Sequence, residues 1–168
     1  SCAYFLARLG YLPRIFEAEA TPGGMLIQAI PAYRLPRKEL FREVQMIQRL
    51  GVEIETGVRL GKDFTLKSLR DEGYEAVFLG VGAPKGQSLR LPGEDVDGVV
   101  EAIDFLREFN LHDRGTVGKN VAVIGGGNAA VDAARTALRL GAKTVSVLYR
   151  RSREEMPAYE EEIRDAEA

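Results

Sequence analysis

The feature that most constrains the fold is a glycine-rich turn between two apolar runs. The run VAVI, Val121 to Ile124, leads into GGGNAA, then into a segment with apolar residues on one helical face, and finally into TVSVLY. This order predicts a buried strand, a tight turn, a helix over about residues 128–140 and a return strand. The turn fits G-x-G-x-x-A, and in this setting the pattern is typical of dinucleotide-binding domains.

Each fixed position of the pattern has a physical reason. Gly125 permits the tight turn, Gly127 lets a diphosphate approach bare backbone, and Ala130 is small enough for the helix to pack closely on the strand. Free amide groups at the helix start, aided by the helix dipole, would hold the anion. The alternative interpretation is a purely structural turn in an α/β unit that binds no ligand.

The end of the return strand discriminates between nicotinamide cofactors. An adenine ribose with a free 2′-hydroxyl is usually held there by Asp or Glu, whereas a 2′-phosphate requires cations. The sequence places Arg150 and Arg151 there, with Arg153 nearby. Because two guanidinium groups can clamp a phosphate, NADP(H) is favoured over NAD(H). The competing interpretation is a solvated segment whose charges pair among themselves, with Glu154 and Glu155 available to Arg153.

Composition excludes several classes of function. With 23 basic and 25 acidic residues among 168, the balance indicates neither a nucleic-acid nor an anionic-membrane partner. No apolar run approaches the roughly 20 residues that span a bilayer, and no secretory signal is evident, so we expect a cytoplasmic protein.

The single cysteine, Cys2, excludes an internal disulfide or CxxC centre, and the single histidine, His112, is interpreted as a solvated loop residue. We therefore expect no metal site, and any redox chemistry would come from an organic cofactor or a partner.

The rest of the chain alternates strand and helix signals. This alternation predicts an α/β fold of two Rossmann-like lobes with mainly parallel sheets, both incomplete, because the chain reads as an internal piece of a longer one. The run 76–81 is apolar at successive residues, as in a strand covered on both faces. The expected elements before the glycine turn are helix 1–9, strand 12–16, helix 36–50, strand 52–55, helix 65–70, strand 76–81, a connection over 84–98 and helix 99–110.

The N-terminal part has half of a second dinucleotide-binding unit. A helix, a short strand and then an acidic residue, Glu17, are what would remain of such a unit without its first strand and glycine turn. Glu17 would accept hydrogen bonds from both ribose hydroxyls of an adenosine. An acidic residue after an apolar run is also common on any protein surface.

Several strings in order resemble one family over essentially the whole chain. They are EAEATPGGMLIQAIPAYRLP, GVEIETGVRL, GYEAVFLGVGAPKGQSLRLPGED, VAVIGGGNAAVDAARTALRLGA and YRRSREEMPAYEEEI. They are similar to the small (β) subunit of glutamate synthase, and equally to the flavin-bearing part of dihydropyrimidine dehydrogenase and to NADPH-ferredoxin reductase subunits of anaerobes.

The resemblance implies a flavoprotein on the glutathione-reductase-like two-domain plan. Residues 1–112 would be a partial FAD domain without its first strand and GxGxxG turn, and residues 113–168 a partial NAD(P)H domain. Hydride would pass from NADPH to FAD, and electrons to iron-sulfur centres outside this chain, in an iron-sulfur domain or an electron-accepting partner subunit. The chain alone would hold FAD poorly and be nearly inactive.

The resemblance also assigns residues to the two cofactors. On the FAD side, Glu17 would bind the ribose, Gly24 and Met25 would lie against the flavin nucleotide, Arg34 near the flavin or its phosphates, Leu60 against the adenine through its backbone, with Gly82 as a weaker candidate. On the nicotinamide side, Gly127, Asn128, Ala129 and Ala130 would hold the diphosphate, and Arg150 and Arg151 the 2′-phosphate. Because the cofactors perform the chemistry, we expect no catalytic acid, base or nucleophile.

Two other functions stay open at this stage. One is a non-catalytic nucleotide-binding scaffold or interaction subunit of a redox complex. The other is a single-domain NAD(P)-dependent dehydrogenase, which is disfavoured because the sequence has no Tyr-x-x-x-Lys motif and no histidine-based proton relay. The final electron acceptor is not identified by these residues.

Overall fold

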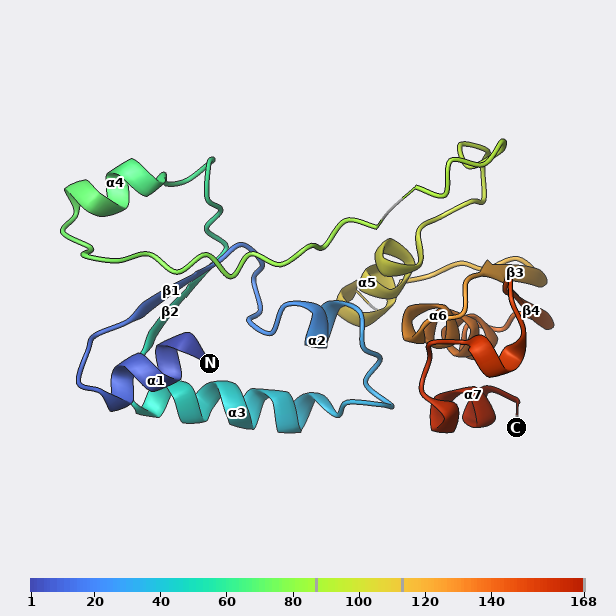
Figure 1. Cartoon of the computed structure of the whole chain (residues 1–168), viewed down its shortest axis with the longest axis horizontal. Coiled ribbons are helices and arrows are strands. Elements are labelled where there is room, and N and C mark those ends of the chain that lie inside the picture. The colour runs from blue at the N-terminus through green and yellow to red at the C-terminus, as the bar shows by residue number, and fades with distance from the viewer. Residues whose placement is uncertain (87, 113, 168) are drawn as a thin grey trace. The chain divides into compact units, whose positions relative to one another are not determined.

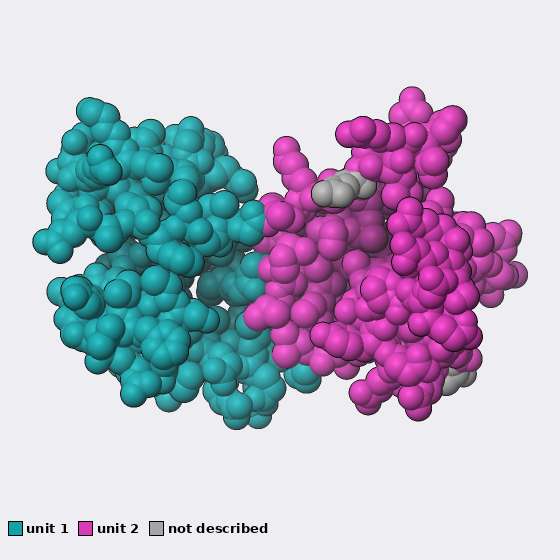
Figure 2. All heavy atoms as spheres, viewed as in Figure 1, with its two compact units in different colours: residues 1–24, 36–82 teal, residues 25–35, 83–168 magenta. Residues whose placement is uncertain are grey.

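The computed structural model describes residues 1–86, 88–112 and 114–167, and it divides into two compact units (Figures 1 and 2). Unit 1 comprises residues Ser1–Gly24 and Pro36–Gly82, and unit 2 comprises Met25–Leu35 and Ala83–Ala168. The expected domain boundary falls at Asp113, which lies outside the described residues. Most of the segment 83–112 packs with unit 2, as does the short segment 25–35.

Unit 1 is built around a parallel pair of short strands. Strand β1 (Arg14–Glu17) pairs with β2 (Glu53–Thr56) in a register that sets Glu17 opposite Thr56. The other elements are the helices α1 (Cys2–Arg8), α3 (Arg37–Arg49) and α4 (Leu66–Asp71). Leu40 of α3 and Leu69 of α4 are buried, and the Phe16 ring of β1 lies 4.8 Å from that of Phe64. These apolar contacts make the core of the unit.

Unit 2 contains the predicted strand–turn–helix–strand motif. Strand β3 (Asn120–Ile124) and strand β4 (Thr144–Leu148) pair in parallel, and helix α6 (Asn128–Arg139) crosses between them and packs on both (Figure 1). This part of the prediction is confirmed. The remaining elements are α2 (Met25–Gln28), α5 (Ala102–His112), a 3-10 turn (Arg153–Glu155) and α7 (Glu160–Glu167).

Helix α6 is the centre of unit 2. It packs against α5, α7 and both strands, and eight consecutive residues from Ala130 to Ala137 are buried. Four of those eight are alanines, whose small side chains allow close approach on every side. The side chain of Leu106 on α5 is 0% exposed, so this leucine contributes a fully buried apolar side chain to the core of unit 2.

Two expectations from the sequence are wrong. The run 76–81 is not a strand, and Phe78 and Val81 in it are 73% and 72% exposed. A strand requires a neighbour for its backbone hydrogen bonds, and among the described residues none pairs with this run. His112 is exposed, as expected, but it is the last residue of α5 rather than a loop residue, because the helix extends two residues beyond Asn110.

In the part of the chain that the structure describes, no helix has both the length and the apolar character needed to cross a bilayer.

We predict that Leu106→Ala destabilises unit 2. Removing a fully buried leucine leaves a cavity, so the free energy of unfolding should fall by about 2–5 kcal/mol. Urea unfolding followed by circular dichroism measures the change. Leu138→Ala on α6 is the control, because Leu138 is 47% exposed and its loss should cost about 0.5 kcal/mol. Equal losses in the two variants would contradict this account of the core.

Candidate nucleotide-binding site

The glycine turn joins the end of β3 to the start of α6. Gly125 has φ +146°, a backbone conformation that favours glycine, and its amide donates to the carbonyl of Leu148 on β4 at 2.9 Å. A β carbon built at position 125 would lie 3.2 Å from that of Ala130. Glycine at position 125 and a small residue at position 130 therefore let the helix start directly against the strand.

The start of α6 presents free amide groups beside open space. The carbonyl of Gly127 accepts hydrogen bonds from Ala130 at 3.0 Å and from Val131 at 3.2 Å. Within the described ranges, the amides of Gly127, Asn128 and Ala129 donate no hydrogen bond. A β carbon at Gly127 would meet no atom within 4 Å. Three unpaired N–H groups at the positive end of a helix can hold an anion, and the missing side chain leaves room for it.

The segment after β4 packs against this turn. The ring of Tyr149 lies so close to Gly126 that a β carbon there would be 2.6 Å from Cδ2. The Tyr149 hydroxyl donates to the carbonyl of Glu155 at 3.3 Å, and the amide of Ala158 donates to the carbonyl of Gly126 at 3.1 Å. The middle glycine is thus required by packing within the protein rather than by access for a ligand.

The side chain of Asn128 has a structural partner. Its Oδ1 accepts a hydrogen bond from the amide of Tyr159 at 3.0 Å, which ties the segment before α7 to the first residue of α6. Asn128 would therefore contribute its backbone amide to an anion while its side chain fixes the neighbouring segment. The sequence gives no signal for this contact, because the two residues are 31 positions apart.

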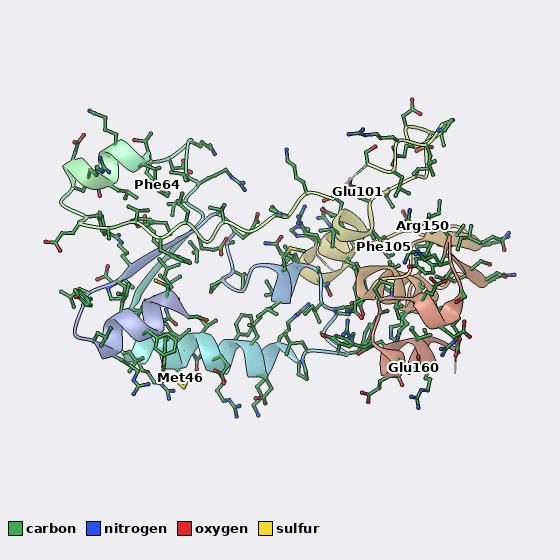
Figure 3. All side chains as sticks on the ribbon, viewed as in Figure 1. Met46, Phe64, Glu101, Phe105, Arg150 and Glu160 are labelled. Carbon is green, nitrogen blue, oxygen red and sulfur yellow. The ribbon has the colours of Figure 1, made fainter. Side chains whose placement is uncertain are left out.

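The arginines after β4 differ in their partners. Arg150, which is labelled in Figure 3, and Arg151 are both exposed. Among the described residues neither of them forms an ion pair or a side-chain hydrogen bond. Arg153 instead pairs with Glu160 at 3.1 Å and Glu167 at 2.9 Å on α7, and these hydrogen bonds raise the pKa of Arg153. The competing interpretation offered Glu154 and Glu155 as partners of Arg153, and the observed ion pairs are instead with Glu160 and Glu167. Two guanidinium groups are left available to a ligand.

The parallel register places the turn and the arginines at one edge of the sheet. Ile124, the last residue of β3, is opposite Leu148, the last residue of β4. Gly125 follows the first strand, and Arg150 lies two residues beyond the second. The carboxyl end of a parallel sheet is where this class of fold binds ligands.

The residues assigned to FAD in unit 1 lie at element ends and turns. Glu17 ends β1, and its Oε1 accepts a hydrogen bond from the amide of Glu19 at 2.9 Å, which orients the carboxylate. Leu60 forms an isolated backbone bridge with Phe64. Gly24 and Gly82 have φ values of +51° and +68°, which suit glycine. All four of these residues belong to unit 1.

The other two residues assigned to FAD belong to unit 2. Met25 is the first residue of α2. The guanidinium group of Arg34 lies 2.6 Å from Asp132 of α6 and 2.6 Å from Glu162 of α7. Burial alone would lower the pKa of Arg34, but the two carboxylates outweigh it and raise that pKa. Burial also raises the pKa of the Asp132 carboxyl, against the opposing charge of Arg34.

Comparison with known proteins identifies the family. The model for the pyridine nucleotide-disulphide oxidoreductases matches residues 1–168. The chain is 49% identical to the NADP(+)-dependent formate dehydrogenase subunit beta of Moorella thermoacetica, over 100% of this chain and 24% of that protein. It is 45% identical to the NADPH-Fe(3+) oxidoreductase subunit beta of Geobacter sulfurreducens, over 94% and 24%, and 35% identical to the small chain of glutamate synthase [NADPH] of Escherichia coli, over 99% and 37%.

Solved structures agree on the fold. FprA of Mycobacterium tuberculosis, as its His57Gln mutant, superposes with a TM-score of 0.83 at 22% identity, over 98% of this chain and 43% of that one. FprA in complex with NADPH gives a TM-score of 0.78 at 23% identity, over 90% and 39%. These structures confirm the predicted α/β fold with Rossmann-like parallel strands, and the match to the E. coli protein confirms the resemblance to the glutamate synthase small subunit. The chain belongs to the pyridine nucleotide-disulphide oxidoreductase family.

Proposed function

We propose that this chain is part of a flavoprotein that binds FAD and NADP(H) and transfers electrons from NADPH through FAD to a further acceptor. The observation that carries the proposal is the start of α6, where three free amides lie beside the open space at Gly127. The relatives from M. thermoacetica, G. sulfurreducens and E. coli all carry NADP(+) or NADPH in their names. The chain spans about a quarter of the length of the first two, so the activity of the whole protein is inferred.

The residues of unit 2 fit NADP(H). The amides of Gly127, Asn128 and Ala129 would donate to the diphosphate, with Gly125 and Ala130 allowing the close approach of helix and strand. Arg150 and Arg151, at the same sheet edge, would bind the 2′-phosphate. Among the described residues neither arginine has an ion pair, which supports this role, because a guanidinium group that must first release a carboxylate binds a phosphate less tightly.

On the FAD side, Glu17 would accept hydrogen bonds from the ribose hydroxyls. Its hydrogen bond from the Glu19 amide uses one carboxylate oxygen and leaves the other for this contact. Gly24, Met25, Leu60 and Gly82 complete the proposed FAD set. Arg34 would lie near this set without contacting a phosphate directly, because its guanidinium is held by Asp132 and Glu162. When both cofactors are bound, the nicotinamide supplies the hydride and the flavin accepts it. The part of the protein is to bind and align them and to exclude water.

The onward acceptor is proposed to lie outside this chain. The relatives named above differ in the compound that their names carry besides the nicotinamide cofactor, which is formate, Fe(3+) or glutamate. A shared electron-delivering module with different partners explains that range. We propose that the chain is of the glutamate synthase small-subunit type and that its partner is an iron-sulfur domain or an electron-accepting subunit.

We predict that Gly127→Ala weakens NADPH binding far more than it weakens the fold. The added methyl group meets no protein atom but would occupy the space of the diphosphate. The dissociation constant should rise at least about tenfold, which corresponds to about 1.4 kcal/mol. The free energy of unfolding should fall by about 1 kcal/mol or less, the cost of alanine at a helix N-cap.

Calorimetric titration of the full chain with NADPH, beside urea unfolding, separates the two effects. Gly118→Ala is the matched control, because its β carbon makes an ordinary 3.5 Å contact away from the turn. Unchanged NADPH affinity in Gly127→Ala would contradict the assignment of this turn.

The double variant Arg150→Ala/Arg151→Ala should lose NADPH affinity selectively. Each charge-assisted hydrogen bond to a phosphate contributes about 1.5–3 kcal/mol, so we expect a loss of about tenfold to a hundredfold or more. NADH, which has no 2′-phosphate, should bind almost as before. Arg164→Ala removes an exposed arginine on α7 that pairs with Glu160, and it controls for the loss of one of the two positive charges that the double variant removes. Equal losses for both nucleotides would remove the argument for NADP(H).

Anaerobic mixing of the intact flavin-loaded protein with NADPH tests the electron transfer itself. We expect the visible absorbance of the flavin to fall when NADPH is added. A protein that binds NADPH but keeps its flavin absorbance would be a scaffold rather than an oxidoreductase.

A further inference from the structure

The segment 25–35 is anchored firmly in unit 2. Its helix α2 is held to α5 at Gln28, whose side-chain oxygen accepts from Arg107 at 3.1 Å and whose carbonyl accepts from Asn110 at 3.0 Å. Its other end is a tight turn, in which the amides of Arg34 and Leu35 both donate to the carbonyl of Pro31 at 3.0 Å. This turn fixes the backbone from which the Arg34 side chain extends.

The side chain of Arg34 bridges two helices of the unit. Nη1 lies 2.6 Å from Oδ2 of Asp132 on α6, and Nε lies 2.6 Å from Oε1 of Glu162 on α7. The side chains of Arg34 and Asp132 are only 16% and 5% exposed. One guanidinium group thus joins three segments of the chain that are distant in sequence.

The surrounding side chains strengthen the same junction. Arg135 of α6 also pairs with Glu162 and lies 3.1 Å from Asp165. The hydroxyl of Tyr33, next to Arg34, donates to the backbone carbonyl of Asp132 at 3.4 Å. The guanidinium of Arg139 lies 3.8 Å from the centre of the Tyr33 ring. The turn at residues 31–35 therefore contacts α6 between Asp132 and Arg139.

The position of this junction relates it to the nucleotide site. Asp132 lies four residues after Asn128, so it is about one helical turn from the free amides. Glu162 lies on α7, and the segment before α7 bonds the Asn128 side chain through Tyr159. A partly buried ion pair contributes stability only when its geometry is good, and it therefore favours one orientation of the helices that carry it.

We propose that Arg34 is a positioning residue for nucleotide binding: held by Asp132 and Glu162, it orients the first turns of α6 so that the free amides point at the diphosphate. This inference rests on the proposed function and deepens it. It gives Arg34 an indirect role, the orientation of α6, which it exerts through Asp132 and Glu162. The names of the relatives do not imply such a role.

The test compares Arg34→Gln with Arg14→Gln in the full chain. Arg14 is the matched control, because it pairs with Glu55 at 2.7 Å but is 39% exposed and lies in unit 1. Dissociation constants for NADPH and NADH are measured at a temperature at which each variant is folded by circular dichroism. Because Arg34 would act through the diphosphate site, Arg34→Gln should weaken both nucleotides by the same factor, about tenfold or more, and Arg14→Gln neither.

Two further variants separate positioning from a loss of stability. Arg34→Lys keeps the charge but cannot form both contacts in the same geometry, so it should recover only part of the affinity. In the double variant Arg34→Gln/Asp132→Asn the affinity should fall no further than in Arg34→Gln, because the two residues act as one unit. A further independent loss would contradict the coupling.

Hydrogen exchange gives a readout that needs no nucleotide. Arg34→Gln should speed exchange of the amides of residues 131–136 in α6, whereas Arg14→Gln should leave them unchanged.

If the unsubstituted chain binds neither nucleotide, the proposed function fails, and hydrogen exchange alone still tests the orientation of α6. Unchanged affinity together with unchanged exchange in Arg34→Gln would overturn the inference. So would a loss restricted to NADPH, which would make Arg34 a direct ligand of the 2′-phosphate.

Discussion

The parallel pairing of β3 with β4 is the interaction on which the candidate site depends. Its register ends both strands at the same edge, so the glycine turn after Ile124 and the arginines after Leu148 emerge together. Helix α6 must cross back between the strands, and its free N-terminal amides are consequently aimed at that edge. The diphosphate site and the 2′-phosphate site that we propose would therefore both follow from one piece of backbone geometry.

The glycines of the turn have three different duties. Gly125 adopts a left-handed conformation and lets Ala130 approach, and Gly126 makes room for the ring of Tyr149. Gly127 alone meets nothing, so the fold gives no reason for the absence of a side chain there. In the proposed site, an anion that approaches the bare backbone would supply the reason, which a purely structural turn would not.

Local patterns predicted most of the secondary structure, and long-range contacts limited the rest. The β3–α6–β4 motif was predictable because its apolar periodicity and glycines are local. The strand expected over 76–81 failed because a strand depends on a neighbour that the pattern does not specify. The partners of Arg34 lie 98 and 128 residues away, so no spacing rule could find them. The same limit hid the pairing of Arg153 with α7, which leaves Arg150 and Arg151 available.

The most direct test of the account is a titration of the chain with NADPH followed residue by residue by amide NMR. The account predicts that the largest shifts, saturating with the bound fraction, occur at the amides of Gly127, Asn128 and Ala129, with smaller ones at Arg150 and Arg151. Saturable binding that leaves those three amides unshifted would contradict the central claim that the start of α6 holds the diphosphate.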